Sequence, residues 1–454
     1  MINIKTDSRK IKPGDIFVAL RGYSSDGHTY IENAISNGAS KLIVEEDRNY
    51  KIPYEVVLNT RDYVTKYLID NYKKYLDEMT IIGITGTNGK TTSAYLIYTA
   101  LNKLGKNCAY IGTIGYYLKE GLEYALANTS PDICDLYELL IDAYDRGYRY
   151  VSLEASSQGL HRKWLSGIPF SYAVFTNLTR DHLDYHNTMD EYAKAKAILF
   201  NQLKQNTGIG IVNYDDSYKN YFICEKLKTY GIKGGDYKAS DIEYSNHGTK
   251  YKCSISNEIL EIDSHLLGKY NIYNMLVAIS ILDNLGYKKN DIEYVIKDLK
   301  CPPGRMDIIV HESNSIIIDY AHTEDAIENI LNTVKAICKG NIYVVFGCTG
   351  NRDTVKRPMM TNLILNNTEY AIITNDDPHD EEPEDIVKDM LLGINNKNYE
   401  IILDRGQAIQ KGINLLKDND ILLILGKGHE EYMIIKDKKI PFNDKKKVEE
   451  ILNK

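Results

Sequence analysis

A phosphate-binding loop is the clearest chemical motif in this sequence. Residues 81–92 read IIGITGTNGKTT, an apolar run followed by a glycine-containing loop and by a helix expected from about Ser93. Two loop glycines let backbone N–H groups approach phosphate oxygens, the helix N-terminus adds positive potential, and a lysine can reach the terminal phosphates. Ile84 replaces the first glycine of the common pattern. The motif predicts ATP as the ligand, with contacts from Gly86, Thr87, Asn88, Gly89, Lys90, Thr91 and Thr92.

Acids and histidines follow two further apolar runs. Glu154 ends the run 150–154, and residues 176–186 read TNLTRDHLDYH, which includes His182. Open α/β sheets bind ligands at the carboxyl ends of their strands, so both segments can meet the phosphate loop. Taken singly, Glu154 would more often be a surface acid and His182 a structural histidine. Their combination with the loop favours a functional role for both.

The elements that must position these motifs fall into three sections. Residues 1–78 predict a small α/β unit, with short strands around a helix that holds residues 30–37. In residues 79–303, apolar β-rich runs alternate with helical stretches, which predicts a mostly parallel sheet with crossover helices. The alternation restarts in residues 304–454 and predicts a Rossmann-like unit. The predicted strands are 16–20, 41–45, 81–85, 151–154, 172–176, 315–319, 342–347, 370–374 and 421–425.

Length and composition agree with a three-domain α/β protein and exclude several classes. The 454 residues suit about three domains at roughly 150 residues each. A net charge of −8 opposes general attraction to nucleic acid or anionic lipid. Seven cysteines without a CxxC pair indicate neither zinc nor a disulfide framework. No apolar run approaches the ~20 residues of a membrane span, and residues 1–7 lack a secretory pattern. We therefore expect a cytoplasmic protein without membrane insertion or nucleic-acid binding.

The order of these motifs resembles the Mur ligases of peptidoglycan synthesis. The loop, Glu154, the RDHLDYH stretch and residues 192–196 (YAKAK) carry the resemblance, and the MurE type fits best. That type comprises the UDP-N-acetylmuramoyl-L-alanyl-D-glutamate ligases, which add the third peptide residue. The resemblance implies an ATP-dependent acid–amino-acid ligase of cell-wall synthesis, and hence of cell shape and division. It implies an N-terminal UDP-binding domain, a central ATP-binding domain, a C-terminal domain for the incoming amino acid, and a monomer.

The same resemblance implies a magnesium centre with a modified lysine. Lys196 resembles the lysine that these ligases carbamylate, and Glu154, His182 and Thr91 would complete sites for two magnesium ions. A cationic amine cannot bind magnesium, whereas its carbamate presents oxygen ligands suited to a hard cation. Without the flanking matches, Lys196 would be interpreted as an exposed helical lysine.

Further matches imply the nucleotide and muramoyl contacts. For ATP they are Asn271 and Asn274 on the adenine side, and Arg305 and Asp319 between domains. Helix-start capping explains either asparagine alone equally well. For the UDP-muramoyl dipeptide they are Ser8, Thr129, Ser130, Ser156 and Arg162. A family arginine is missing near Trp164, and either Arg162 or Lys163 could replace it.

The amino-acid pocket is expected in the last domain, formed by Arg352, Asp376, Asp377, His379, Gly426 and Glu430. Ligases for meso-diaminopimelate typically show Asp-Asn-Pro-Arg, whose arginine grips the distal carboxylate, but here Asp377 and His379 occupy two of these positions. With Asp380 and Glu381 nearby, a cationic side chain is the better electrostatic match, so we predict L-lysine over meso-diaminopimelate. Complementation of the helix dipole before Pro383 explains Asp380 and Glu381 equally well.

The implied reaction is phosphorylation of the glutamyl carboxylate by ATP, followed by attack of the incoming amine on the acyl phosphate. Lys90, magnesium and Arg305 would stabilise the transferring phosphoryl group. Two alternatives are a folylpolyglutamate synthase, whose loop usually continues Gly-Lys-Gly-Ser, and a non-catalytic sensor of UDP-muramoyl peptides. Retention of Lys90, Glu154, His182 and Lys196 favours the enzyme over the sensor.

Overall fold

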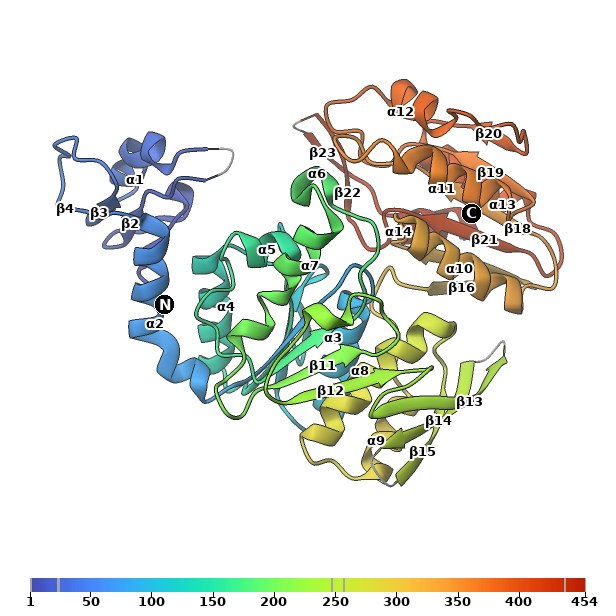
Figure 1. Cartoon of the computed structure of the whole chain (residues 1–454). Helices are drawn as coiled ribbons and strands as arrows, with labels where there is room; N and C mark the ends of the chain where they lie inside the picture. Colours follow the sequence, from blue (N-terminus) through green and yellow to red (C-terminus); the bar gives the residue numbers. More distant parts are fainter. Residues whose placement is uncertain (1, 23–24, 246–247, 256–257, 437, 454) are drawn as a thin grey trace.

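The computed structural model describes residues 2–22, 25–245, 248–255, 258–436 and 438–453. Its three main bodies follow one another along the chain (Figure 1). Each body has its own sheet: four strands in the first, eleven in the second and six in the third, within these described residues. The α/β class with a mostly parallel central sheet is confirmed. No helix in the described ranges is long and apolar enough to cross a membrane.

The N-terminal body is a parallel sheet in the order β1-β2-β3-β4. Its strands are β1 (Ile4–Lys5), β2 (Ile16–Val18), β3 (Lys41–Val44) and β4 (Tyr54–Val56), and its helix is α1 (Ile31–Ser36). Helix α2 (Thr60–Asp77) connects this body to the central one and packs against α4 (Ile133–Asp145). In Figure 1 the N-terminal body stands at the far end of α2, away from the C-terminal body.

The central body is built on a sheet in the order β15-β14-β13-β12-β11-β10-β5-β9-β6-β7-β8. β5 (Thr80–Thr85) lies in parallel between β9 (Tyr150–Glu154) and β10 (Tyr172–Phe175). The carboxyl ends of these three strands therefore share one edge, which brings the phosphate loop, Glu154 and residues 176–182 together. The other strands are β6 (Cys108–Gly112), β7 (Gly115–Leu118), β8 (Gly121–Tyr124), β11 (Ile209–Asn213), β12 (Leu227–Gly231), β13 (Tyr237–Ser245), β14 (Gly248–Ile255) and β15 (Glu258–Ser264).

Helices cover both faces of this sheet. They are α3 (Lys90–Lys103), α4, α5 (Ser157–His161), α6 (Leu183–His186), α7 (Met189–Ala197), α8 (Lys269–Asn284) and α9 (Lys289–Lys297). α3 begins at Lys90 and so starts three residues before the position expected from the sequence. The difference places Lys90, Thr91 and Thr92 in the first helical turn, where their backbone N–H groups have no helical acceptor.

The C-terminal body has the sheet order β16-β17-β21-β18-β19-β20, parallel except for the edge strand β16. The strands are β16 (Asp307–His311), β17 (Asn314–Asp319), β18 (Ile342–Phe346), β19 (Tyr370–Ile373), β20 (Tyr399–Ile401) and β21 (Ile421–Leu425). The helices are α10 (Glu324–Ile337), α11 (Lys356–Leu365), α12 (Pro383–Met390), α13 (Arg405–Leu415) and α14 (Asp444–Leu452). A hairpin of β22 (Tyr432–Ile435) and β23 (Lys438–Pro441) follows the sheet.

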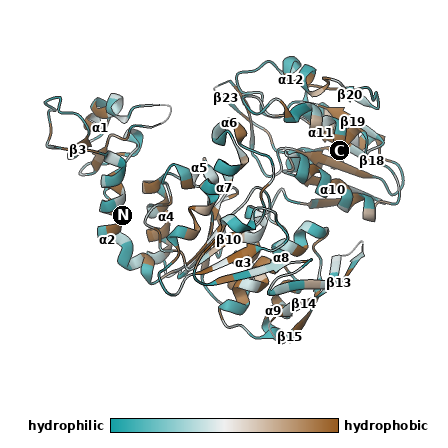
Figure 2. Ribbon diagram, in the orientation of Figure 1, coloured by the Kyte–Doolittle hydropathy of each residue, from teal (hydrophilic) through white to brown (hydrophobic). Residues whose placement is uncertain are grey.

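Continuous apolar runs form the buried strands, as sheets covered on both faces require. Every residue of β18 and β21 is buried, and so is every residue of β5 after its first. In Figure 2 the strands inside the central and C-terminal bodies are largely hydrophobic, and the helices around them combine hydrophilic and hydrophobic residues. Strand ends differ from the sequence expectation by at most two residues, as with β2, which ends at Val18.

Candidate active site

The phosphate loop has the geometry that its glycines predict. Gly89 caps α3 with a φ of 84°, and a Cβ there would lie 2.6 Å from the Asn274 Oδ1. A Cβ on Gly86 would lie 1.8 Å from the Thr176 Oγ1, so both positions exclude larger residues. Lys90 Nζ donates to the carbonyls of Gly86 and Thr87, each at 2.9 Å. Burial lowers the pKa of Lys90. The charges of Glu154 and Asp181 oppose this decrease, and the charge of Arg305 adds to it. The lysine therefore lies over the loop, where the charges of both acids act on it.

Glu154 is fully buried at the floor of the site, so it is not a surface acid. Its Oε2 accepts hydrogen bonds from the hydroxyls of Thr91 (2.9 Å) and Thr113 (3.0 Å). Its Oε1 accepts from the Thr113 N–H (2.9 Å) and from the Tyr110 hydroxyl. Within the described ranges, no lysine, arginine or histidine nitrogen lies within 4.0 Å of this carboxylate. A buried carboxylate without a cationic partner fits a divalent cation at this position.

Lys196 is also buried, with 1% of its surface exposed, so the interpretation as an exposed helical lysine is wrong. Its Nζ donates to the Gly86 carbonyl at 2.7 Å and lies 4.4 Å from the centre of the Tyr192 ring. Burial and, after it, the charge of Lys90 lower the pKa of Lys196 well below its ordinary value. A lowered pKa favours the neutral amine, which is the form that adds to carbon dioxide. The environment therefore fits carbamate formation. The carbamate could bind a cation, whereas the ammonium could not.

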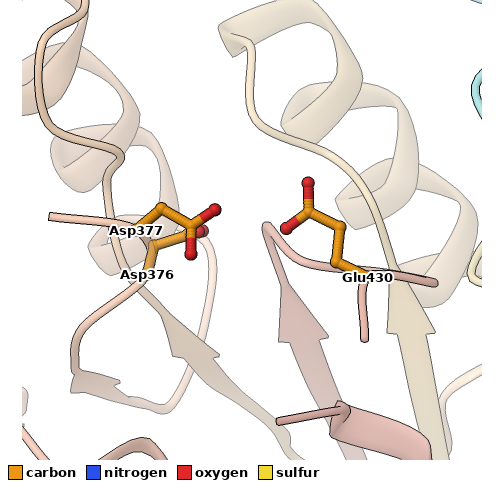
Figure 3. A group of neighbouring side chains, drawn as sticks. All are labelled: Asp376, Asp377 and Glu430. Atoms are coloured by element: carbon orange, nitrogen blue, oxygen red, sulfur yellow. The ribbon is translucent and has the colours of Figure 1, made fainter. Parts of the chain in front are cut away.

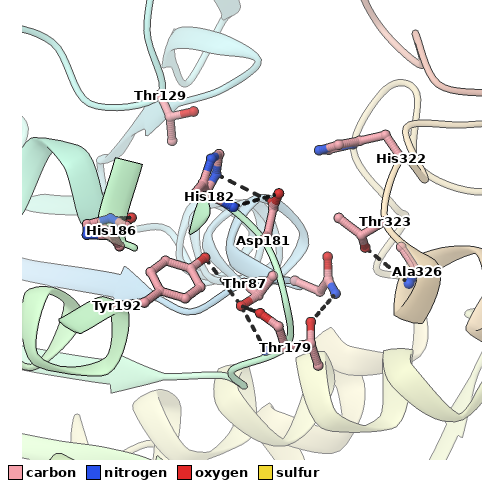
Figure 4. A network of polar contacts seen from close by, with 12 residues as sticks. Thr87, Thr129, Thr179, Asp181, His182, His186, Tyr192, His322, Thr323 and Ala326 are labelled. Atoms are coloured by element: carbon pink, nitrogen blue, oxygen red, sulfur yellow. Dashed lines mark hydrogen bonds and ion pairs between the residues drawn. The ribbon is translucent and has the colours of Figure 1, made fainter. Parts of the chain in front are cut away.

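His182 lies beside Asp181 and the Tyr192 ring, as Figure 4 shows. It immediately precedes α6 in a left-handed conformation (φ 53°), and its Nε2 lies 3.4 Å from an Asp181 carboxylate oxygen. Burial lowers the pKa of His182 to about 4, against the opposing charge of Asp181, and Lys196 and Lys90 lower it further. The imidazole is therefore neutral near pH 7, which is the state that binds a metal ion. The structure thus brings together Lys90, Glu154, His182 and Lys196.

Arg305 comes from the C-terminal body, and its charge acts on Lys90 of the phosphate loop. Its guanidinium stacks 4.4 Å from the centre of the Tyr320 ring, and its Nε is buried without a partner in the described part of the chain. Asp319 accepts hydrogen bonds from the N–H groups of Met306 and Ala321, both at 2.8 Å. One oxygen of Asp319 thus holds the turn that carries Arg305, and the other holds the segment that follows β17.

The two asparagines of α8 occupy different positions. Asn274 Oδ1 accepts from the Ser93 hydroxyl at 3.1 Å and packs against Gly89, so this side chain borders the nucleotide loop. Asn274 Nδ2 donates to Asn271 Oδ1 at 3.0 Å, and Asn271 Nδ2 donates to the Leu267 carbonyl at 2.8 Å. Asn271 therefore fits the alternative interpretation as a residue that stabilises the start of α8.

The residues predicted for the muramoyl dipeptide lead from the N-terminal body to Glu154. Ser8 lies in a short 3-10 helix, and the neighbouring Thr6 hydroxyl donates to Asp132 at 2.7 Å. Ser130 donates to the Glu154 carbonyl at 3.0 Å, and the hydroxyls of Thr129 and Thr113 lie 3.0 Å apart. These contacts join the turn of Ser8, the loop 129–132 and the Glu154 site into one path.

At the other side of this path, Ser156 caps α5 by accepting from the Gly159 N–H at 3.1 Å. Lys163 forms an exposed ion pair with Asp62 at 3.1 Å. The Arg162 guanidinium lies 5.1 Å from the centre of the Tyr185 ring. Which of these two residues replaces the missing arginine stays a prediction, with Arg162 as the predicted dipeptide contact.

Three acids of the predicted amino-acid pocket lie together, as Figure 3 shows for Asp376, Asp377 and Glu430. Sequence reasoning missed their partner, Lys427, whose side chain is fully buried. Its Nζ lies 2.8 Å from Asp377, 2.8 Å from Glu430 and 3.8 Å from Asp376. Burial raises the pKa of Glu430 to about 7, although Lys427 lowers it. The sequence feature that could have indicated Lys427 is its position between the predicted contacts Gly426 and Glu430.

This lysine corrects the electrostatic argument for an L-lysine substrate. One internal cation already offsets part of the negative charge of these three acids, so counting the acids alone overstates the preference for a cationic substrate side chain. The other two acids are also engaged: Glu381 pairs with Arg357 at 2.8 Å, and Asp380 accepts from Asn351 at 2.7 Å.

The last two predicted contacts border this pocket. His379 is half-buried with a φ of 51°, and its backbone pairs with the β22 hairpin. Arg352 is exposed on the loop 350–353, which is held to the acid loop by the bond from Gly350 N–H to the Asp377 carbonyl (2.8 Å).

Contacts across the domain boundary were also missed. Asn88 Nδ2 in the phosphate loop donates to Asp325 at 2.7 Å, and Lys356 lies 3.7 Å from Asp181. His429 Nε2 lies 3.3 Å from the Thr113 carbonyl. The C-terminal body therefore faces the loops that carry Lys90, His182 and Glu154.

Comparison with known proteins identifies the family. The Mur ligase catalytic domain matches residues 2–84, the Mur ligase middle domain residues 84–282, and the glutamate ligase domain of Mur ligases residues 304–428. The chain belongs to the Mur ligase family. It is a ligase of peptidoglycan synthesis with a nucleotide-binding site, and the predicted resemblance to the MurE type is confirmed.

Relatives extend along almost the whole chain. A UDP-N-acetylmuramoyl-L-alanyl-D-glutamate–2,6-diaminopimelate ligase of Clostridium perfringens is 40% identical and covers 99% of this chain and 94% of its own. A ligase of the same name from Aquifex aeolicus is 37% identical, over 99% of this chain and 93% of its own. A solved structure of such a ligase has 33% identity and a TM-score of 0.69, over 100% of this chain and 95% of its own.

More distant Mur ligases share the fold. MurF of Thermotoga maritima, solved in complex with ADP, has 18% identity and a TM-score of 0.70, over 99% of this chain and 96% of its own. The prediction that L-lysine is favoured finds no support, because the diaminopimelate ligases above are named for the other amino acid.

Proposed function

We propose that this protein uses ATP and magnesium to join meso-2,6-diaminopimelate to UDP-N-acetylmuramoyl-L-alanyl-D-glutamate. The observation that carries the proposal is the convergence of Glu154, Lys196 and His182 on the loop of Lys90, because a phosphate site and cation ligands then share one cleft edge. The names of relatives up to 40% identical support the amino acid. Lys427 supports it as well, since it offsets part of the negative charge that would otherwise repel the distal carboxylate of this substrate.

The residues act by binding and by neutralising charge. The glutamyl carboxylate oxygen attacks the γ-phosphorus, the bond to ADP breaks, and an acyl phosphate forms. Lys90 and the loop N–H groups hold the phosphates, while Arg305 approaches from the C-terminal body to offset the charge on the transferring group. When bound to Glu154, His182, Thr91 and the carbamate of Lys196, two magnesium ions would supply further charge neutralisation.

The second step occurs between the bodies. The incoming amine attacks the carbonyl carbon, loses a proton, and phosphate leaves with the bonding pair. Asp376, Asp377 and Glu430 with Lys427 would bind the amino acid, together with Arg352, His379 and Gly426. The dipeptide would lie along Ser8, Thr129, Ser130, Ser156 and Arg162. The adenine would lie beside Asn274, which Asn271 supports. Asp319 would orient Arg305.

We assign residues 1–78 to UDP binding, 79–303 to ATP binding and 304–454 to the amino acid. That the enzyme acts as a monomer stays a prediction.

The test is incubation with UDP-muramoyl dipeptide, ATP, magnesium and one amino acid at a time, with products identified by mass spectrometry. We expect the tripeptide with meso-diaminopimelate to form fastest. Faster formation with L-lysine would overturn the amino acid, and no product with any amino acid would overturn the function.

A further inference from the structure

His429 connects the predicted amino-acid loop to the carboxyl-activating site. It lies between Gly428 and Glu430 in the loop after β21, and its ring reaches across the domain boundary. Its Nε2 lies 3.3 Å from the Thr113 carbonyl oxygen, which can only accept. The ring therefore donates its Nε2–H to the central body.

Thr113 is a junction of the central site. Its N–H and its hydroxyl both donate to Glu154, at 2.9 and 3.0 Å, and its hydroxyl lies 3.0 Å from that of Thr129. These bonds to Glu154 and Thr129 fix Thr113 within the central body, so its carbonyl is a fixed acceptor whether or not His429 contacts it. His429 thus bonds to the residue that contacts both.

The C-terminal body fixes His429 from the other side. A Cβ on Gly304 would lie 2.1 Å from the His429 backbone nitrogen, so the turn of Arg305 packs directly against this loop. The Tyr320 ring, on which Arg305 stacks, has its centre 5.5 Å from that of His429. Burial, reinforced by Arg305, lowers the pKa of His429 to about 4, so the ring is neutral near pH 7. Its Nδ1 is buried and has no partner in the described ranges.

We propose that His429 is a positioning residue that aligns the loop of the bound amino acid with the acyl phosphate by anchoring it to Thr113. The inference rests on the proposed function. Because the bond joins the two bodies, its loss affects the second step, in which the amine must reach the carbonyl carbon. Phosphoryl transfer to the carboxylate, which needs the central body and Arg305, does not require it.

The variants His429→Leu, His429→Gln and His429→Asn test this. Glutamine can place an amide N–H where Nε2 lies, asparagine places it where Nδ1 lies, and leucine offers no donor. In the first assay, which contains UDP-muramoyl dipeptide and ATP but no amino acid, borohydride traps the acyl phosphate. In the second assay, meso-diaminopimelate is added and tripeptide formation is measured. His311→Leu, on the edge strand β16, is the matched control.

We expect His429→Leu to trap acyl phosphate at the wild-type level but to form tripeptide about tenfold more slowly, the size expected for one hydrogen bond that aligns reactants. Glutamine should recover most of this loss and asparagine little. Equal loss of both steps, no loss of either, or equal rates for glutamine and asparagine would overturn the proposal. If the leucine variant does not fold, the glutamine and asparagine pair decides alone. Failure of the proposed function can be distinguished from failure of the His429 proposal, because the wild type itself would then form no tripeptide.

Discussion

Lys196 donates a hydrogen bond to the carbonyl of Gly86, 2.7 Å away, so a buried lysine of α7 lies directly against the phosphate loop. The pair connects two segments that are 110 residues apart in the chain. An ammonium at this position repels the cations that phosphates bring with them, whereas a carbamate would attract them.

Replacing Lys196 by alanine should lower the rate of tripeptide formation by about two to three orders of magnitude, because an anionic ligand near the transferring phosphate is lost. Short carboxylic acids should restore part of the rate by occupying the place of the carbamate. Lys194→Ala, an exposed position on the same helix, is the control. The carbamate is not the active form if the added carboxylic acids leave the rate of the Lys196 variant unchanged, or if they raise the rate of the Lys194 control by the same factor.

Replacing Lys427 by methionine should shift the selectivity from meso-diaminopimelate towards L-lysine, by about tenfold in the ratio of kcat/KM values. The acids Asp377 and Glu430 would lose their internal cation, and their uncompensated charge would repel the distal carboxylate of meso-diaminopimelate, which L-lysine lacks. Lys445→Met, which removes a half-exposed ion pair with Asp307, is the control. An unchanged ratio in a folded Lys427 variant would show that this charge does not set selectivity.

Glu430 should make amino-acid binding depend on pH. Its pKa is raised to about 7, so the carboxylate that attracts the substrate amine becomes populated as the pH rises through 7. The KM for meso-diaminopimelate should therefore fall between about pH 6 and pH 8. The same pKa shift favours the protonated folded state, so its contribution to stability is present at low pH and is lost as the pH rises through 7. Glu430→Gln should abolish this dependence of KM, and a variant that keeps it would assign the titration elsewhere.

Much of the fold could be predicted from local patterns in the sequence. The buried strands β5, β18 and β21 are continuous apolar runs, and the loop between β5 and α3 carries its own glycine signature. Glu154 was found because it ends such a strand beside that loop. These features depend on neighbours in the chain, which a sequence shows directly.

The misjudged features depend on residues that are distant in sequence. The charge of Asp377 cannot be evaluated without Lys427, 50 residues later, and counting the acids alone led to the prediction of an L-lysine substrate. The bond from the Met306 N–H to Asp319 is likewise not visible in a local pattern, and a nucleotide contact of Asp319 stays a prediction. The bond between His429 and Thr113 joins two bodies, and no local pattern indicates it.

Phosphate release by Lys90→Ala, compared with the wild type, tests most directly whether ATP is used at this loop. In the wild type, release should require both UDP-muramoyl dipeptide and the amino acid. The variant keeps Glu154, His182 and Lys196 but loses the cation over the phosphates, so we expect its rate to fall by about three orders of magnitude. A folded Lys90→Ala variant with wild-type phosphate release would contradict the assignment of the site.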